Sequence, residues 1–282
     1  MPLLYPVAAA VLQSVSFTLD KVTLSIKKVS YRMYNGISFP LMFLFTLILF
    51  FIFKAPLSLE LFKGWLLVLL ILSTVAIIIT NIVFYRALKS DKLSEMETIS
   101  LLNTIPLVIF TSIFFKDERN WVVVSLALVA VLVLVWSHWK RHHFSIARKT
   151  LPFLIWTLAI SPFRGIIAKI LLESWNPISL QLVENFFISL IFIPWFYRDI
   201  KKVPMRGFLF LMVTNILTTV AWILYYFSYQ VSGVVYTVLI FSIQPLLVYF
   251  ACVFFLKEKL EWKKAVAFGV ILITIIVAQV TG

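Results

Sequence analysis

The chain consists of long apolar runs separated by short polar gaps. Most runs approach twenty residues without a two-residue alternation, so the pattern predicts helices rather than strands. Such a run can cross a hydrocarbon layer of roughly 30 Å at about 1.5 Å per residue. We therefore predict ten membrane-spanning helices, at about 3–24, 33–53, 63–86, 95–115, 121–139, 151–172, 178–197, 206–229, 233–255 and 263–280.

Composition supports a bilayer as the solvent. Of the 282 residues, 62% are hydrophobic and 13% are charged. Soluble domains average roughly 45–50% hydrophobic residues and about 25% charged residues. Inside lipid each span must satisfy its own backbone hydrogen bonds, which again favours helices. The sequence thus predicts an all-α, multi-pass protein of the plasma or inner membrane, with only short loops.

The formal net charge of +13 is consistent with the predicted membrane protein. Most lysines and arginines lie in the short gaps between spans, where such residues set orientation and contact anionic lipid head groups. No soluble basic face remains for nucleic acid, so membrane lipid is the expected partner of these side chains. The single cysteine, Cys252, lies in an apolar run, and no disulfide framework is expected.

The stretch Trp222–Val280 reads as a second copy of Asn81–Val135. Aromatic pairs correspond at Phe84-Tyr85 and Tyr225-Tyr226, and each copy carries a proline followed by a glutamate, with spacings of twelve and thirteen residues (Pro106 to Glu118 and Pro245 to Glu258). We predict a first five-helix repeat at 1–140, a basic linker at 141–150 and a second five-helix repeat at 151–282. Repeats with an odd number of spans enter the membrane from opposite sides, so the two would be inverted.

These features carry a family resemblance. The Tyr-x-Ala-Leu-Lys stretch at Tyr85–Lys89 and the proline-to-glutamate spacing in each half resemble the EamA-type transporters of the drug/metabolite transporter superfamily. The resemblance implies a ten-helix carrier of amino acids, other small metabolites or drugs, commonly an exporter. Asn35 and Asn185 stand near places where such proteins often carry an arginine.

Charged residues inside the spans are costly and therefore informative. Lys21 and Lys169 occupy corresponding positions of the two repeats, where they either reach the head groups or form a basic cavity lining for an anionic group. Glu184 lies on one helical face with Gln181. It either pairs with Arg164 or Lys169, or acts as a protonatable switch, which makes protons a candidate coupling partner.

Polar and aromatic residues near the repeat motifs complete the predicted substrate-binding set, which is Asn35, Tyr85, Asn103, Trp156, Asn185, Trp222, Tyr226, Tyr236 and Gln244. Pro106 and Pro245 lie inside spans, where each removes a helix hydrogen bond. We interpret them either as kinks required for packing or as hinges for alternating access. Glu118 and Glu258 lie at span ends beside bases and are expected to cap the next helix or pair locally.

No active site is expected. His138, His142 and His143 have a metal-like spacing, but no Asp, Glu or Cys accompanies them in the linker. The sequence shows neither a phosphate-cradling glycine loop nor a paired nucleophile and base, so we predict no catalytic residue, metal or cofactor.

The sequence therefore predicts a secondary transporter that moves a small-molecule cargo, such as an amino acid, by alternating access through a central cavity. Export is the direction that the family resemblance implies. Two other readings stay open. A nucleotide-sugar or phospho-metabolite exchanger would share the fold, and a lipid-linked-sugar flippase would differ by a lateral opening.

Overall fold

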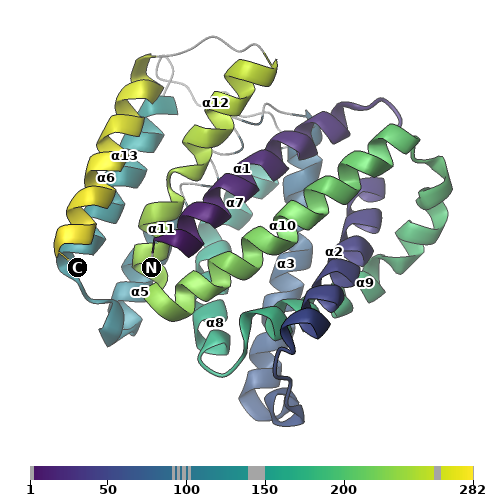
Figure 1. The fold of residues 1–282 in the computed structure, drawn as a ribbon, viewed down its shortest axis with the longest axis horizontal. Coiled ribbons are helices and arrows are strands. Elements are labelled where there is room, and N and C mark those ends of the chain that lie inside the picture. Colours follow the sequence, from purple (N-terminus) through teal and green to yellow (C-terminus); the bar gives the residue numbers. More distant parts are fainter. Residues whose placement is uncertain are drawn as a thin grey trace.

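The computed structural model describes residues 3–90, 93, 96, 100, 103–138, 150–256 and 262–281. In these ranges the chain forms helices and no strands (Figure 1). The elements are α1 (Leu4–Ser25), α2 (Tyr31–Phe53), η1 (Leu59–Phe62), α3 (Gly64–Ser90), α5 (Thr104–Phe114), η2 (Lys116–Glu118), α6 (Trp121–His138), α7 (Leu151–Ala159), α8 (Ser161–Leu172), α9 (Pro177–Asp199), η3 (Ile200–Lys202), α10 (Met205–Ser232), α11 (Val234–Phe241), α12 (Gln244–Leu256) and α13 (Trp262–Thr281).

The predicted all-helical membrane fold is confirmed. Six described helices are long and apolar enough to cross a membrane, namely α1, α2, α3, α9 with η3, α10, and α11 joined to α12 over Val234–Ala251. The pair α7 and α8 bends by 44° and is either a broken span or a re-entrant loop, and α5, α6 and α13 contribute shorter apolar stretches. The count of ten spans stays a prediction. The predicted linker lies almost entirely in 139–149, outside the described residues.

Local sequence explains several helix ends and breaks. Asn176 accepts a hydrogen bond from the Ile178 amide at 2.9 Å, and Pro177 follows it at the first position of α9. Pro162 lies just after the bend between α7 and α8, and Pro245 lies just after the break between α11 and α12. Because proline has no amide hydrogen, each removes a bond that would have continued the helix. Pro106 is the third residue of α5.

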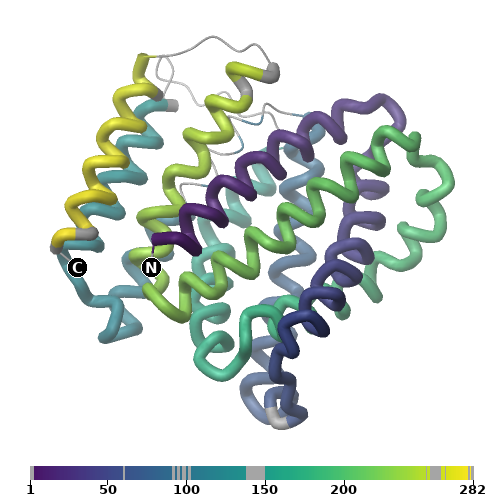
Figure 2. Tube along the Cα trace, viewed as in Figure 1, coloured from purple at the N-terminus to yellow at the C-terminus, as the bar shows by residue number. Residues whose placement is uncertain are grey.

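Helices distant in sequence lie side by side (Figures 1 and 2). Helix α1 packs along α10, α2 along α9, and α6 along α13. If the two predicted halves correspond, α3 is the counterpart of α10, and α7 with α8 is the counterpart of α1. The contacts of α3 with α7 and α8 then match the contact of α10 with α1. This pairing is what a twofold relation between the halves requires, although the inverted repeat itself stays a prediction.

The close approach of α2 to α9 depends on a small residue. A Cβ atom added to Gly36 would lie 2.8 Å from the Cβ atom of Trp195 and 3.0 Å from its backbone carbonyl carbon. Small residues allow membrane helices to pack backbone to backbone in this way.

The molecule turns apolar side chains outward and many polar ones inward. Phe51 and Ile276 are 68% and 62% exposed, as suits contact with lipid, whereas Gln13, Asp20 and Glu184 are buried. A buried polar group needs a partner or a polar ligand, because lipid supplies neither. The interior is therefore the place to look for function.

Candidate functional site

A central cavity of about 260 Å³ lies among residues of α1, α2, α3, α5 and α7 to α12. Eight of the residues predicted from sequence line it: Tyr85, Asn103, Glu184, Asn185, Trp222, Tyr226, Gln244 and Pro245. They come from both predicted halves of the chain. The structure thus brings together the aromatic pairs and the polar residues that follow the repeat motifs, while their role in binding stays a prediction.

The other six predicted residues lie outside the lining. Lys21 donates to the Leu88 carbonyl at 2.7 Å, and the Asn35 amide donates to the Tyr31 carbonyl at 2.9 Å. Trp156 reaches the cavity wall indirectly, because its indole donates to the Thr80 hydroxyl at 2.8 Å. The remaining three are Pro106 in α5, Lys169 in α8 and Tyr236 in α11.

Several lining groups were not in the predicted set. Gln13, Thr157, Arg164 and Gln181 line the cavity, and each has a buried side-chain polar atom without a hydrogen-bond partner among the described residues, as do Asn103 and Gln244. Buried polar atoms are normally paired, so six unpaired ones around one cavity indicate a polar ligand or water. The sequence signal for these residues was simply polarity inside an apolar run.

Opposite charges meet at the cavity wall. The Arg164 guanidinium lies 5.1 Å above the Trp222 ring and donates to the Tyr226 hydroxyl at 3.3 Å. That hydroxyl in turn donates to Glu184 at 3.3 Å, and Ser73 donates to the other carboxylate oxygen at 2.5 Å. The predicted pairing of Glu184 with Arg164 thus runs through Tyr226. In a low-dielectric interior these fixed charges act strongly on a bound ligand.

A second buried carboxylate lies behind the wall. Asp20 on α1 is fully buried and accepts hydrogen bonds from the hydroxyls of Tyr34, of Tyr85 at 3.2 Å and of Thr214 at 2.5 Å. Tyr85 also lines the cavity. The site therefore has an inner carboxylate whose partners include a wall residue.

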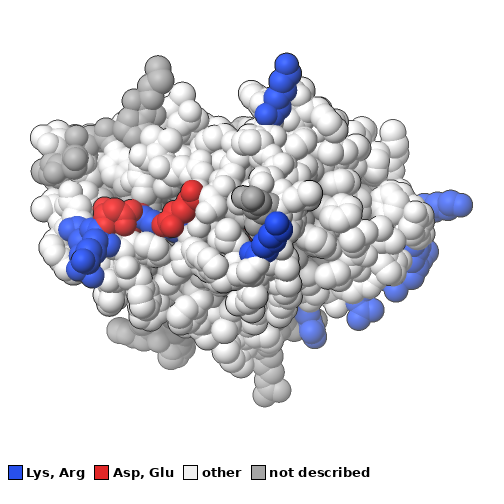
Figure 3. Space-filling model, turned by 90° about the horizontal axis from the view of Figure 1, so that it is seen from below, with Lys and Arg blue, Asp and Glu red and all other residues white. Residues whose placement is uncertain are grey.

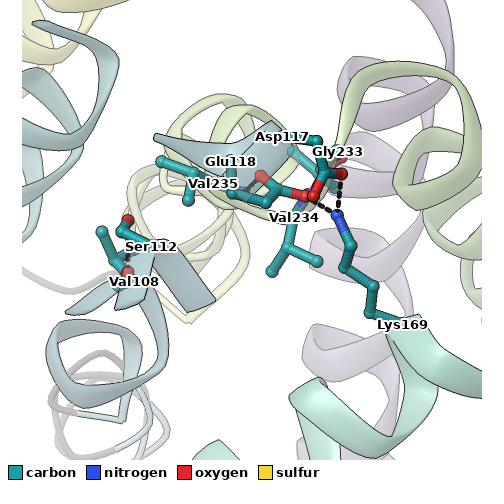
Figure 4. Close-up of polar contacts among 9 residues, drawn as sticks. Val108, Ser112, Asp117, Glu118, Lys169, Gly233, Val234 and Val235 are labelled. Atoms are coloured by element: carbon teal, nitrogen blue, oxygen red, sulfur yellow. Dashed lines mark hydrogen bonds and ion pairs between the residues drawn. The ribbon is translucent and has the colours of Figure 1, made fainter. Parts of the chain in front are cut away.

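A third cluster joins elements at one end of the bundle (Figure 4). Glu118, in η2, accepts hydrogen bonds from the amides of Val234 at 2.7 Å and Val235 at 3.0 Å, and its carboxylate lies 2.5 Å from Lys169. Glu118 therefore caps α11, which lies far along the chain, whereas the sequence led us to expect a cap on the next helix or a local pair. We call Glu118, Lys169 and the turn Gly233–Val235 the Glu118 cluster.

Asp117 adds an exposed second partner to the same lysine. Its carboxylate lies 2.5 Å from Lys169, and its side chain is 69% exposed. The hydrogen bond from Lys169 lowers the pKa of the Asp117 carboxyl below its ordinary value. The pair is therefore charged at neutral pH, but solvent screens it.

Charge is sparse on the face seen from below, where lysines, arginines and acidic residues stand as scattered groups on an uncharged surface (Figure 3). Within the described ranges no three His, Cys, Asp or Glu side chains gather as a metal ion requires. Of the predicted linker histidines, His142 and His143 lie outside the described residues, as does Glu258.

Comparison with known proteins agrees with this architecture. One solved structure, described as "Crystal structure of protein", matches 99% of this chain and 96% of its own with a TM-score of 0.74 at 15% identity, which shows a shared fold. No curated protein matches the chain. The model of the EamA-like transporter family matches residues 149–279, essentially the predicted second repeat. The resemblance seen in the sequence is thereby confirmed over residues 149–279, which match the EamA-like transporter family, and that family implies a membrane transporter of small molecules.

Proposed function

We propose that this protein is a secondary transporter that exports small zwitterionic metabolites, such as amino acids, by alternating access through the central cavity between inverted repeats. The observation that supports it is the wall chemistry, in which Arg164 and Glu184 offer opposite charges beside the Trp222 and Tyr226 rings. An arginine suits a carboxylate and a glutamate suits an ammonium group. Export follows the resemblance to the family.

Size and charge together narrow the cargo. A cavity of about 260 Å³ is below the usual range of roughly 300–1,000 Å³ for drug-sized ligands. Among the described lining residues Arg164 is the one basic side chain, and Glu184 opposes it. A nucleotide sugar or phosphorylated solute carries more negative charge than this pair can match. The wall therefore favours a small zwitterion over a phosphorylated cargo.

The Glu118 cluster supplies a gate for this cycle. Its carboxylate comes from the first predicted half, whereas Lys169 and the α11 amides come from the second. Opening that end of the bundle has to separate the Glu118 carboxylate from Lys169 and from the α11 amides. Each cycle between the two access states would therefore break these contacts and form them again.

The test is a solute panel on purified full-length protein. A bound cargo stabilises the folded state, by about 2.7 kcal/mol at a hundred times its Kd, so amino acids are expected to raise the unfolding temperature while UDP-glucose does not. Arg164→Gln and Glu184→Gln should each abolish that rise. Arg198→Gln is the matched control, because Arg198 pairs with Asp199 outside the cavity lining.

Counterflow in proteoliposomes then tests transport itself. Vesicles loaded with the unlabelled stabilising amino acid should accumulate the same labelled compound, and the two cavity variants should not. Stabilisation by UDP-glucose alone, or a rise that survives Arg164→Gln, would contradict the proposal.

A further inference from the structure

Asp20 differs from Glu184 in its charge environment within the described part of the chain. Glu184 is linked to Arg164 by two hydrogen bonds through the Tyr226 hydroxyl. Asp20 is 0% exposed, yet no lysine or arginine among the described residues forms an ion pair with it. A buried carboxylate without a countercharge is costly, and a bound proton removes that cost.

The titratable and charged groups around Asp20 can be named element by element. Helix α2 brings Tyr34 and α3 brings Tyr85, and both donate to the carboxylate. Lys21, next in α1, donates to the Leu88 carbonyl, and Lys89 of α3 donates to the carbonyls of Leu24 and Val29. Helix α10 contributes the neutral Thr214, and α11 and α12, which also pack on α1, bring no ion pair to Asp20 within the described residues.

A chain of hydroxyls connects the cavity to this carboxylate. Thr218 lines the cavity, and its hydroxyl lies 2.5 Å from that of Ser16. Ser16 lies 2.7 Å from the Thr214 hydroxyl, which lies 2.5 Å from the carboxylate. Each hydroxyl can donate and accept, so a proton can pass along the chain by successive transfers, each oxygen receiving one proton and releasing another. No net charge stays on the chain.

The donors also argue for a proton over a metal ion. Sodium-like and divalent cations need several oxygen lone pairs directed at them. Here the hydroxyls of Tyr34, Tyr85 and Thr214 direct hydrogens at Asp20. A proton needs only one oxygen of the carboxylate.

We propose that Asp20 is the proton-binding site of this transporter, reached from the central cavity through Thr218, Ser16 and Thr214. The proton that arrives through Thr214 forms an O–H bond on the Oδ1 atom of Asp20, which also accepts from Tyr34, so the Tyr34 hydroxyl has to turn or withdraw. The ring centroids of Tyr34 and Tyr85 lie 4.3 Å apart, and Tyr85 donates to Oδ2 and lines the cavity, so proton binding acts on the wall that meets the cargo through this pair of rings. The coupling part of this inference rests on the proposed transport function; the proton site does not.

Infrared spectroscopy tests the site on full-length protein in vesicles, without any cargo. The carbonyl stretch of a protonated carboxylic acid should appear as the pH is lowered, and Asp20→Asn should lose that band. Glu184→Gln is the matched control and should retain it. Loss of the band in Glu184→Gln with retention in Asp20→Asn would overturn the proposal.

Two further measurements do not depend on how well Asp20→Asn folds. After a pH jump, Ser16→Ala should slow the growth of the band without changing its final amplitude, because it removes one hydroxyl of the chain. Exchanging potassium for sodium should leave the titration unchanged. An unaltered rate in Ser16→Ala overturns the route, and a sodium-dependent titration overturns the proton as the ligand.

Discussion

At Gly233 the chain passes from α10 to α11 with φ of 81° and ψ of 169°. This backbone region is essentially restricted to glycine. A Cβ atom there would also lie 2.8 Å from both carboxylate oxygens of Glu118. One hydrogen atom in place of a side chain therefore allows both the turn and the approach of the carboxylate that caps α11.

Gly233→Ala should consequently destabilise the protein, by about 1–3 kcal/mol for the backbone strain alone. Thermal unfolding of the purified protein measures this. Gly269→Ala is the matched control, because a Cβ atom at Gly269 in α13 meets nothing within 4 Å, and alanine favours a helix by up to about 1 kcal/mol over glycine. Equal unfolding temperatures for the two variants would show that the Gly233 turn is not strained by a side chain.

Single residues also explain why sequence reasoning gave Asp20 no role. Asp20 and Lys21 are neighbours in the sequence. Adjacent residues on a helix point in different directions, however, and the two side chains have separate partners, hydroxyls for Asp20 and the Leu88 carbonyl for Lys21. Those partners lie on other helices, so spacing along α1 could not reveal them.

At the scale of elements, the start of α11 depends on a group from another part of the chain. The first four amides of a helix lack partners within it. The turn offers Gly233 as the preceding residue, which has no side chain to cap them. Glu118 supplies acceptors for two of these amides, and its negative charge suits the positive end of the helix.

Glu118→Gln should loosen this helix start. The neutral amide keeps one acceptor oxygen, so one buried amide and Lys169 lose part of their bonding, at a cost of about 1–3 kcal/mol. Hydrogen exchange followed by mass spectrometry should show faster exchange at residues 234–236. Unchanged exchange there would show that the cap does not hold α11.

Asp117→Asn is the matched control for that variant, because it alters the neighbouring carboxylate on the same lysine. The Asp117 side chain is 69% exposed, so Asp117→Asn should lower the free energy of unfolding by no more than about 1 kcal/mol at neutral pH. The pKa of Asp117 is lowered, so the pair stabilises the fold above the ordinary carboxyl pKa and the contribution disappears as the pH falls through the lowered value. The difference in unfolding temperature between wild type and Asp117→Asn should therefore shrink on acidification. A difference that grows instead would contradict the pairing with Lys169.

At the scale of the molecule, the sequence predicted the class of fold because apolar run length is a local property. It also placed Tyr85 and Tyr226 on the cavity wall, since both accompany the duplicated motif. It could not identify Glu118 as the partner of Lys169, because the two are 51 residues apart in the sequence. Nor could it identify Glu118 as the cap of α11, because Val234 lies 116 residues further along the chain. Such contacts depend on how the halves dock, which no spacing within one span encodes.

That docking leads to a prediction about the two halves. The pairs α1 with α10, α2 with α9 and α6 with α13 each join a helix before residue 139 to one after residue 149. Separating the halves would leave groups such as Thr214 without Ser16, and would expose in lipid the Gly36 surface that now meets Trp195.

Co-expressed chains 1–144 and 145–282 should therefore purify together through a tag on either one, whereas each alone should aggregate in detergent. Size-exclusion chromatography of the tagged products measures this. Gly36→Leu should weaken the recovered complex, because its side chain would enter the contact between α2 and α9, and Gly269→Leu should leave it intact, because its position in α13 is open. If chain 145–282 alone were monodisperse and as stable as the full protein, residues 149–279 would form an independent unit, and a cavity built from both halves could not be the basis of transport.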